Sequence, residues 1–284
     1  MSTSIAQRVF KASLCCAAVL TVLNASAQER NSGAVNISPF SNSPSRSAPA
    51  ASDSAGPFGQ DASAYTLTFS DEFESGFNSS VWNEAADENY SNAVTNFAVE
   101  DGSLKIWPAR GRNGEFFNRI IDTNGKFYQR YGYFEMEAKL PIGKGTWPAF
   151  WLFNYINGQK PEIDIMEAYG GGSASGWSDD NYHPTGYAPV VWRDTNDRAG
   201  FALLFGLGDL SANYHKYAVK WEPGKQTFYF DGREVYSVNA NIDHPLYIKL
   251  DLLYGSAAGR PDASTPTGPG NSFDIRYVRA WQFK

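Results

Sequence analysis

The sequence predicts an all-β fold in which two antiparallel sheets pack face to face. Three observations support this fold class. Apolar and polar residues alternate in several short segments, as in strands that bury one face. The 26 Gly and 15 Pro residues supply frequent turns. No segment keeps the period of a long helix and there is no internal repeat, so a sandwich of many short strands fits best.

The individual strands follow from local patterns. Residues 131–140 alternate most clearly, because apolar residues face one way while Glu135, Glu137 and Lys139 face the other. Residues 217–221 and 227–230 flank a Pro-Gly turn and predict a hairpin. An Asp-Gly pair at 231–232 predicts the next hairpin turn. The other predicted strands are residues 65–69, 104–107, 150–153, 162–166, 233–238, 246–252 and 273–281.

The N-terminal residues differ in composition from the rest. Residues 1–27 are typical of a secretory signal peptide, with Arg8 and Lys11 before a short apolar run and Ala-Ser-Ala at 25–27. The run is shorter than the about 20 residues of a membrane span, so we expect a secreted or periplasmic protein without a membrane anchor. Residues 28–63, rich in Ser, Pro and Ala, predict a disordered linker. Residues 64–284 then form one folded domain.

Charge and cysteine content exclude several classes of protein. The formal net charge is −6, and because residues 1–27 carry two positive and no negative charges, the remainder carries −8. Such a surface disfavours nucleic acid and anionic membranes as partners. It suits a neutral polymer, and it repels a strongly anionic one unless a local basic patch intervenes. Cys15 and Cys16 are the only cysteines, and both lie in the predicted signal peptide. If cleavage follows Ala27, we expect a mature chain with no disulfide and no cysteine-bound metal.

The segment 162–167, Glu-Ile-Asp-Ile-Met-Glu, carries the chemistry. In a regular strand Glu162 and Asp164 share a face and Glu167 points away. One inserted residue near Ile165 and Met166, a β-bulge, returns Glu167 to that face. Neighbouring carboxylates raise one another's pKa, which suits the acid and nucleophile pair of a glycoside hydrolase. On spacing alone, a solvated acidic edge or a calcium site remains open.

Other segments add context to this motif. They are Gly-Thr-Trp-Pro-Ala-Phe-Trp-Leu-Phe at 145–153, and residues 69–73, 131–141, 261–266 and 273–279. Together and in this order, the segments resemble glycoside hydrolase family 16 over nearly all of residues 65–284. The Glu-x-Asp-x-x-Glu spacing resembles the bulged branch of that family, which holds laminarinase-like enzymes, agarases, carrageenases and bacterial exopolysaccharide glycanases.

The resemblance implies a jelly-roll sandwich with a concave substrate groove and a catalytic domain at 64–284. It implies hydrolysis with retention at the anomeric carbon. Glu162 would be the nucleophile and Glu167 the general acid and then the base. Asp164 would hydrogen-bond Glu162 and help to set the two pKa values. No cofactor for catalysis is implied.

Candidate substrate-binding residues are mostly aromatic. The resemblance places Trp147 at the floor or wall of the groove, and Trp151 shares its face by spacing. Trp177 and Trp192 belong to the loop-rich stretch 170–200, where ligand contacts are common. His183 lies in the same stretch. A packed structural role is the alternative for each of them.

A structural calcium ion is also implied by the resemblance, on the side away from the groove. Asp274 matches a carboxylate ligand there, and Glu72 and the Gly102 carbonyl are weaker candidates. The three histidines show no metal-ligand spacing, which argues against zinc.

Four hypotheses follow for the activity. The first is a monomeric, endo-acting, retaining hydrolase of a polysaccharide, β-1,3 or mixed β-1,3/1,4-glucan. The second is a depolymerase of a bacterial exopolysaccharide. The third is a transglycosylase that uses the same residues and excludes water. The fourth is a non-catalytic carbohydrate-binding sandwich, which would not need the costly carboxylate cluster.

Overall fold

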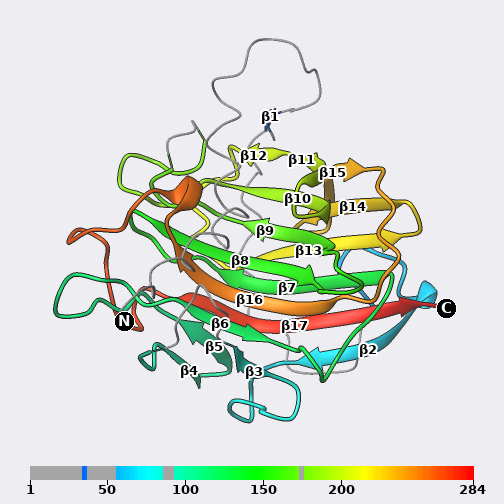
Figure 1. Ribbon diagram of the computed structural model, residues 1–284, viewed down its shortest axis with the longest axis horizontal. Helices are drawn as coiled ribbons and strands as arrows, with labels where there is room; N and C mark the ends of the chain where they lie inside the picture. Colours follow the sequence, from blue (N-terminus) through cyan, green and yellow to red (C-terminus); the bar gives the residue numbers. More distant parts are fainter. Residues whose placement is uncertain (1–33, 37–55, 86–92, 173–175) are drawn as a thin grey trace, which may run out of the picture.

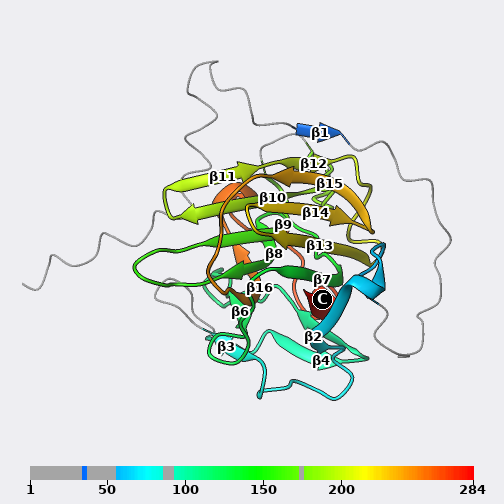
Figure 2. The same ribbon diagram turned by 90° about the vertical axis from the view of Figure 1, so that its right-hand side faces the viewer.

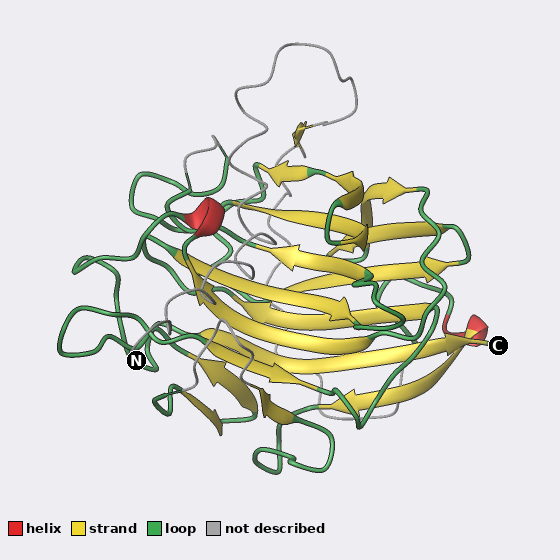
Figure 3. Ribbon diagram, in the orientation of Figure 1, coloured by secondary structure: helices red, strands yellow, loops and turns green. Residues whose placement is uncertain are grey.

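The computed structural model describes residues 34–36, 56–85, 93–172 and 176–284. The predicted signal peptide, residues 1–27, lies outside the described residues, as does most of the predicted linker at 28–63. Within the described residues, nearly all regular structure is strand, and the two short 3-10 helices are η3 (Ala62–Ala64) and η4 (Ser256–Ala258) (Figure 3). No described helix is long and apolar enough to cross a membrane.

The strands form two stacked antiparallel sheets, a jelly-roll sandwich, which confirms the predicted fold class (Figures 1 and 2). The nine-stranded sheet has the order β1 (Ala34–Asn36), β12 (Leu203–Phe205), β10 (Gly186–Asp194), β9 (Glu162–Glu167), β8 (Thr146–Phe153), β16 (Tyr247–Tyr254), β6 (Arg119–Asp122) and β3 (Asn83–Ala85), with β11 (Asp197–Phe201) paired to β10. The eight-stranded sheet has the order β15 (Arg233–Val238), β14 (Lys225–Phe230), β13 (His215–Glu222), β7 (Gly132–Lys139), β17 (Phe273–Phe283), β5 (Ser103–Ile106) and β4 (Phe97–Glu100), with β2 (Tyr65–Asp71) paired to β17. The one parallel pair in the described sheets is β1 with β12.

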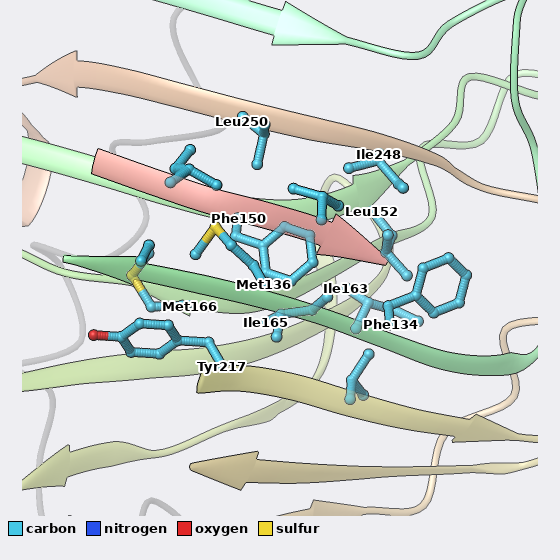
Figure 4. Close-up of a cluster of buried hydrophobic side chains, with 14 of the residues drawn as sticks. Phe134, Met136, Phe150, Leu152, Ile163, Ile165, Met166, Tyr217, Ile248 and Leu250 are labelled. Carbon is cyan, nitrogen blue, oxygen red and sulfur yellow. The ribbon is translucent and has the colours of Figure 1, made fainter. Parts of the chain in front are cut away.

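The core lies between the two sheets and fixes which residues face outward. Phe150 and Leu152 on β8, Ile163 on β9 and Leu250 on β16 are fully buried there, against Met136 of β7 (Figure 4). Burying each large side chain stabilises the fold by about 1.5–3 kcal/mol. Because side chains alternate along a strand, the odd-numbered residues of β8 and β16 must face away from the core. We call this outer side of the nine-stranded sheet the carboxylate face.

Two described parts of the segment 28–63 are ordered. Residues 34–36 form β1 at the edge of the nine-stranded sheet. Residues 56–63 pack on the eight-stranded sheet, where the Phe58 N–H donates to Glu135 Oε2 at 3.1 Å and the Lys216 ammonium lies 4.6 Å from the Phe58 ring centroid. Composition did not reveal these contacts, because single apolar residues among Ser and Pro carry little signal.

Candidate active site

Strand pairing shows how β9 presents its three carboxylates. Glu162 pairs with Phe153 of β8, and Glu167 pairs with Ala149. The six residues 162–167 of β9 thus oppose the five residues 149–153 of β8, so one extra residue lies between Asp164 and Met166. The same irregularity occurs against β10. This is the β-bulge that the spacing predicted.

The bulge sorts the side chains of β9 between the two faces. Ile163, Ile165 and Met166 all belong to the buried core, two of them consecutive in sequence. Glu162 and Glu167 remain partly exposed, whereas Asp164 between them is 3% exposed. The extra inward residue therefore places all three carboxylates on the carboxylate face.

Burial and mutual repulsion shift the proton affinities of these groups. Burial raises the pKa of Glu162 to about 7 and that of Glu167 to about 8. The pKa of Asp164 lies well above its usual range, because of burial and the charges of Glu162 and Glu167. A hydrogen bond with Asp164 and the charge of Lys249 partly offset the rise for Glu162. At neutral pH the arrangement favours a protonated Asp164 that donates to an ionised Glu162.

Two aromatic side chains hold Glu167. The Trp147 Nε1–H donates to Glu167 Oε1 at 2.9 Å, and Tyr169 forms a second side-chain hydrogen bond with Glu167. The rings of Trp147 and Tyr169 lie 5.8 Å apart, and Trp177 stands edge-on to Tyr169 at 4.5 Å. Both hydrogen bonds lower the pKa of Glu167, so they oppose the larger effect of burial.

Strand β16 adds two polar residues that sequence analysis had not assigned to the site. Asp251 is 1% exposed and accepts a hydrogen bond from Trp151 Nε1 at 2.8 Å. Its charge raises the pKa of Asp164 and Glu167. Lys249 places its ammonium 4.3 Å from the Trp151 ring centroid. The alternation of residues 246–252 indicated a shared face for Lys249 and Asp251, but not which strand lies beside them.

The structure separates the predicted substrate-binding residues into two groups. Trp147 and Trp151 contact the carboxylates as described, and Trp192 pairs with Glu162 across β9 and β10. Trp177 is 4% exposed and packs on Tyr169. His183 lies in the loop before β10, and its Nδ1 is 2.8 Å from Asp209 Oδ2. Substrate contact by these five residues stays a prediction.

The three predicted calcium ligands have different surroundings. Both carboxylate oxygens of Glu72 accept hydrogen bonds from Arg279, each at 2.7 Å, so Glu72 does not fit as a ligand in this arrangement. Asp274 is 6% exposed, with its Oδ1 lacking a hydrogen-bond partner, and Gly102 lies in the turn between β4 and β5. The described residues contain no group of three or more His, Cys, Asp or Glu side chains suited to a metal. Calcium binding stays a prediction, which Asp274 and the Gly102 carbonyl still allow.

The turn before Trp147 is packed against residues 261–266. Gly145 has φ +83°, and a Cβ there would lie 2.3 Å from Pro261 N. Gly143 has φ +115°, and a Cβ there would lie 2.8 Å from Pro266 Cδ. An ion pair of 2.8 Å between Lys144 Nζ and Asp262 Oδ2 ties the same two segments. We call residues 143–145 and 261–266 together the Trp147 wall.

Comparisons with known proteins identify the family of this chain. The family model for glycosyl hydrolases family 16 matches residues 73–278. The endo-1,3-1,4-beta-glycanase ExsH of Rhizobium meliloti is 30% identical over 199 residues, covering 66% of this chain and 40% of the relative. The glucan endo-1,3-beta-glucosidase A1 of Niallia circulans is 32% identical over 235 residues, covering 71% and 33%. The chain thus spans well under half the length of these two curated relatives.

Solved structures show the same fold. The endo-beta-1,3-glucanase from Pyrococcus furiosus superposes with a TM-score of 0.64 at 25% identity, covering 78% of this chain and 95% of that chain. The laminarinase catalytic domain from Thermotoga maritima superposes with a TM-score of 0.63 at 23% identity, covering 78% and 99%. With the bulged carboxylate strand in place and the family model matched over most of the folded domain, the chain belongs to glycosyl hydrolases family 16.

Proposed function

We propose that this chain is a retaining, endo-acting β-glucanase that cleaves β-1,3 or mixed β-1,3/1,4-glucan. The observation that carries the proposal is the bulged strand β9, which puts Glu162, Asp164 and Glu167 on one face. Carboxylates crowded in this way weaken a fold, and glycoside hydrolysis is the chemistry that uses them. The printed name of the Niallia circulans relative, a glucan endo-1,3-beta-glucosidase, supports a β-glucan as substrate. The printed name of the Rhizobium meliloti relative, an endo-1,3-1,4-beta-glycanase, supports β-1,3 and β-1,4 linkages.

The proton affinities support a different role for each carboxylate. Glu162, with the lower pKa of the two partly exposed groups, is the nucleophile, and Glu167 is the general acid. In the first step Glu167 protonates the glycosidic oxygen while the Glu162 carboxylate attacks the anomeric carbon. The C–O bond to the leaving chain breaks, and a glycosyl ester forms on Glu162.

The second step reverses these roles. Glu167, now ionised, removes a proton from water, and that water attacks the anomeric carbon. The bond to Glu162 breaks and the sugar leaves with its original configuration. Asp164 keeps a hydrogen bond on Glu162 during both steps, so it steadies the charge that appears and disappears there.

A reducing-sugar assay on laminarin, lichenan, agarose, carrageenan and bacterial exopolysaccharides tests the proposal. We expect activity on laminarin or lichenan that Glu162→Ala and Glu167→Ala each lower by at least about a thousandfold. Glu234→Ala, which removes an exposed glutamate on β15, is the matched control.

Two further readouts test the retaining mechanism. Proton NMR of the first product should show the β-anomer before mutarotation. Azide added to Glu162→Ala with an activated glycoside should give an α-glycosyl azide, because azide replaces the missing nucleophile. An α-anomer as first product would contradict the proposal. So would tight glycan binding without turnover, which is the behaviour of a binding module.

A further inference from the structure

Lys249 is a cation on the carboxylate face. Its strand, β16, is separated from β9 only by β8, and in the pairing Lys249 lies opposite Trp151, which itself lies opposite Asp164. The residue is 7% exposed. Most of its length is therefore covered, and its charge acts through a medium less polar than bulk water.

The ammonium lies over two aromatic rings of β8, the strand between β16 and β9. Its Nζ lies 4.3 Å from the ring centroid of Trp151 and 5.3 Å from that of Phe153. These are the β8 residues opposite Asp164 and Glu162. Among the described residues no carboxylate oxygen lies within 4.0 Å of Lys249 Nζ, so no single acid neutralises it.

We propose that Lys249 is a positioning residue that holds the nucleophile Glu162 in its ionised form, and that the cation–π contact with the Trp151 indole fixes the lysine ammonium in place. The inference rests on the proposed function for the role of Glu162. The cation does not touch the reacting atoms. It acts through space, across the single intervening strand β8, on the carboxylate that must carry charge before substrate arrives.

Few charged groups around Glu162 favour its ionised form. By alternation along the strands, the charged or titratable residues that share the carboxylate face include Asp164 and Glu167 on β9, Lys160 in the loop before it, Asp194 on β10, Arg198 on β11, Tyr247, Lys249 and Asp251 on β16, and Asp122 on β6. Burial favours a protonated Glu162, whereas the hydrogen bond with Asp164 favours its ionised form. Lys249 and Lys160 are the cations that lower its pKa, with the effect of Lys249 the larger.

The second lysine is less constrained. Lys160 stands in the β8–β9 loop, and its Nζ lies 6.0 Å from the ring of the exposed Tyr155. Lys249 is fixed between paired strands and covered by aromatic rings. A fixed charge needs no reorganisation when the nucleophile ionises, so Lys249 is the more effective of the two.

A variant pair separates charge from packing. Lys249→Met keeps the covered chain and removes the charge, and Lys249→Arg keeps the charge. Two strand spacings put Lys249 about 10 Å from β9, and one charge at about 10 Å with an effective dielectric constant of about 20 shifts a pKa by about one pH unit. We therefore expect the pKa of Glu162 to rise by about one pH unit in Lys249→Met and to return in Lys249→Arg.

The direct measurement is a pH titration of ¹³C-labelled glutamate carboxyl groups by NMR, with Glu162 assigned from the spectrum of Glu162→Gln. It needs no catalysis, so it tests this inference even if the proposed activity fails. The kinetic measurement is kcat/KM against pH. Its acidic limb should move up with the carboxyl pKa, giving about a tenfold loss well below the limb and none above it.

Lys139→Met is the matched control. Lys139 lies over the ring of Tyr214 at 5.4 Å, as Lys249 lies over Trp151, but belongs to the eight-stranded sheet. It should leave the titration of Glu162 unchanged. An unchanged Glu162 titration in Lys249→Met would overturn the proposal, and so would a loss of activity equal at every pH, the mark of a structural role. A loss confined to acid-substituted glucans would overturn it too, in favour of an anion-binding subsite.

Discussion

Trp147 offers the sharpest test of how the site sets the proton affinity of Glu167, the proposed general acid. The change is Trp147→Phe, which keeps an aromatic ring against Tyr169 and removes the Nε1–H that donates to Glu167 Oε1 at 2.9 Å. That hydrogen bond favours the ionised carboxylate and lowers the pKa of Glu167. Its loss must therefore raise the pKa of Glu167 above its value of about 8.

The size of this effect follows from the strength of a hydrogen bond to a charged group. Such a bond contributes about 1.5–3 kcal/mol, and about 1.4 kcal/mol corresponds to one pKa unit. Glu167 keeps some exposure to water and retains its hydrogen bond with Tyr169, so the lower end of the range applies. We expect the alkaline limb of kcat/KM to move up by about one pH unit.

The assay is initial rate on laminarin or lichenan across the pH range, for wild type and variants. Tyr169→Phe removes the other hydrogen bond and should move the same limb in the same direction. Trp192→Phe is the control, because Trp192 pairs with Glu162 and not with Glu167. An alkaline limb that stays in place or moves down in Trp147→Phe would refute the reasoning.

Three further predictions concern stability. The pKa of Glu167 is about 8 in the folded protein against a usual 4.5, so the folded state loses stability as pH rises from about 4.5 to about 8. In calorimetry, Glu167→Gln should therefore raise Tm near pH 9 by at least about 3 °C and have little effect near pH 4. A lower Tm near pH 9 would contradict this. Phe150→Ala, in the core, should cost about 3–5 kcal/mol in urea unfolding, and a cost below about 1 kcal/mol would be inconsistent with the packing. Gly145→Ala should cost about 2 kcal/mol more than Gly76→Ala, since the two share nearly the same φ but only Gly145 meets a neighbour, Pro261 N; equal costs would show that the contact is unimportant.

The local sequence pattern was sufficient to predict the strands that bury one face. Residues 131–140 alternate, and β7 occupies Gly132–Lys139. The carboxylate spacing required a bulge, and the structure contains it. Alternation did not mark strand β10, and Trp192 was placed in a loop-rich stretch, because six consecutive residues of β10 are buried.

The neighbours of the carboxylates could not be predicted from the sequence, for a different reason. Alternation shows which side chains share a face, but it does not show which strands pair. The pairing of β8 with β16 joins residues about a hundred positions apart, and only the fold brings Lys249 and Asp251 beside Trp151. Register between distant strands is set by the packing of the whole sandwich, so these roles appear only with the structure.

The Trp147 wall limits how the proposed active site can be re-engineered. At Gly143 and Gly145 any side chain meets the proline-containing segment opposite, and the ion pair of Lys144 with Asp262 joins the two strips of backbone. Neither glycine can be replaced without moving the segment opposite. A library that diversifies Gly143 or Gly145 alone would mostly yield destabilised chains, whereas exchanging both segments together as one cassette preserves their fit. Changes of substrate preference are therefore more accessible at loops away from this wall.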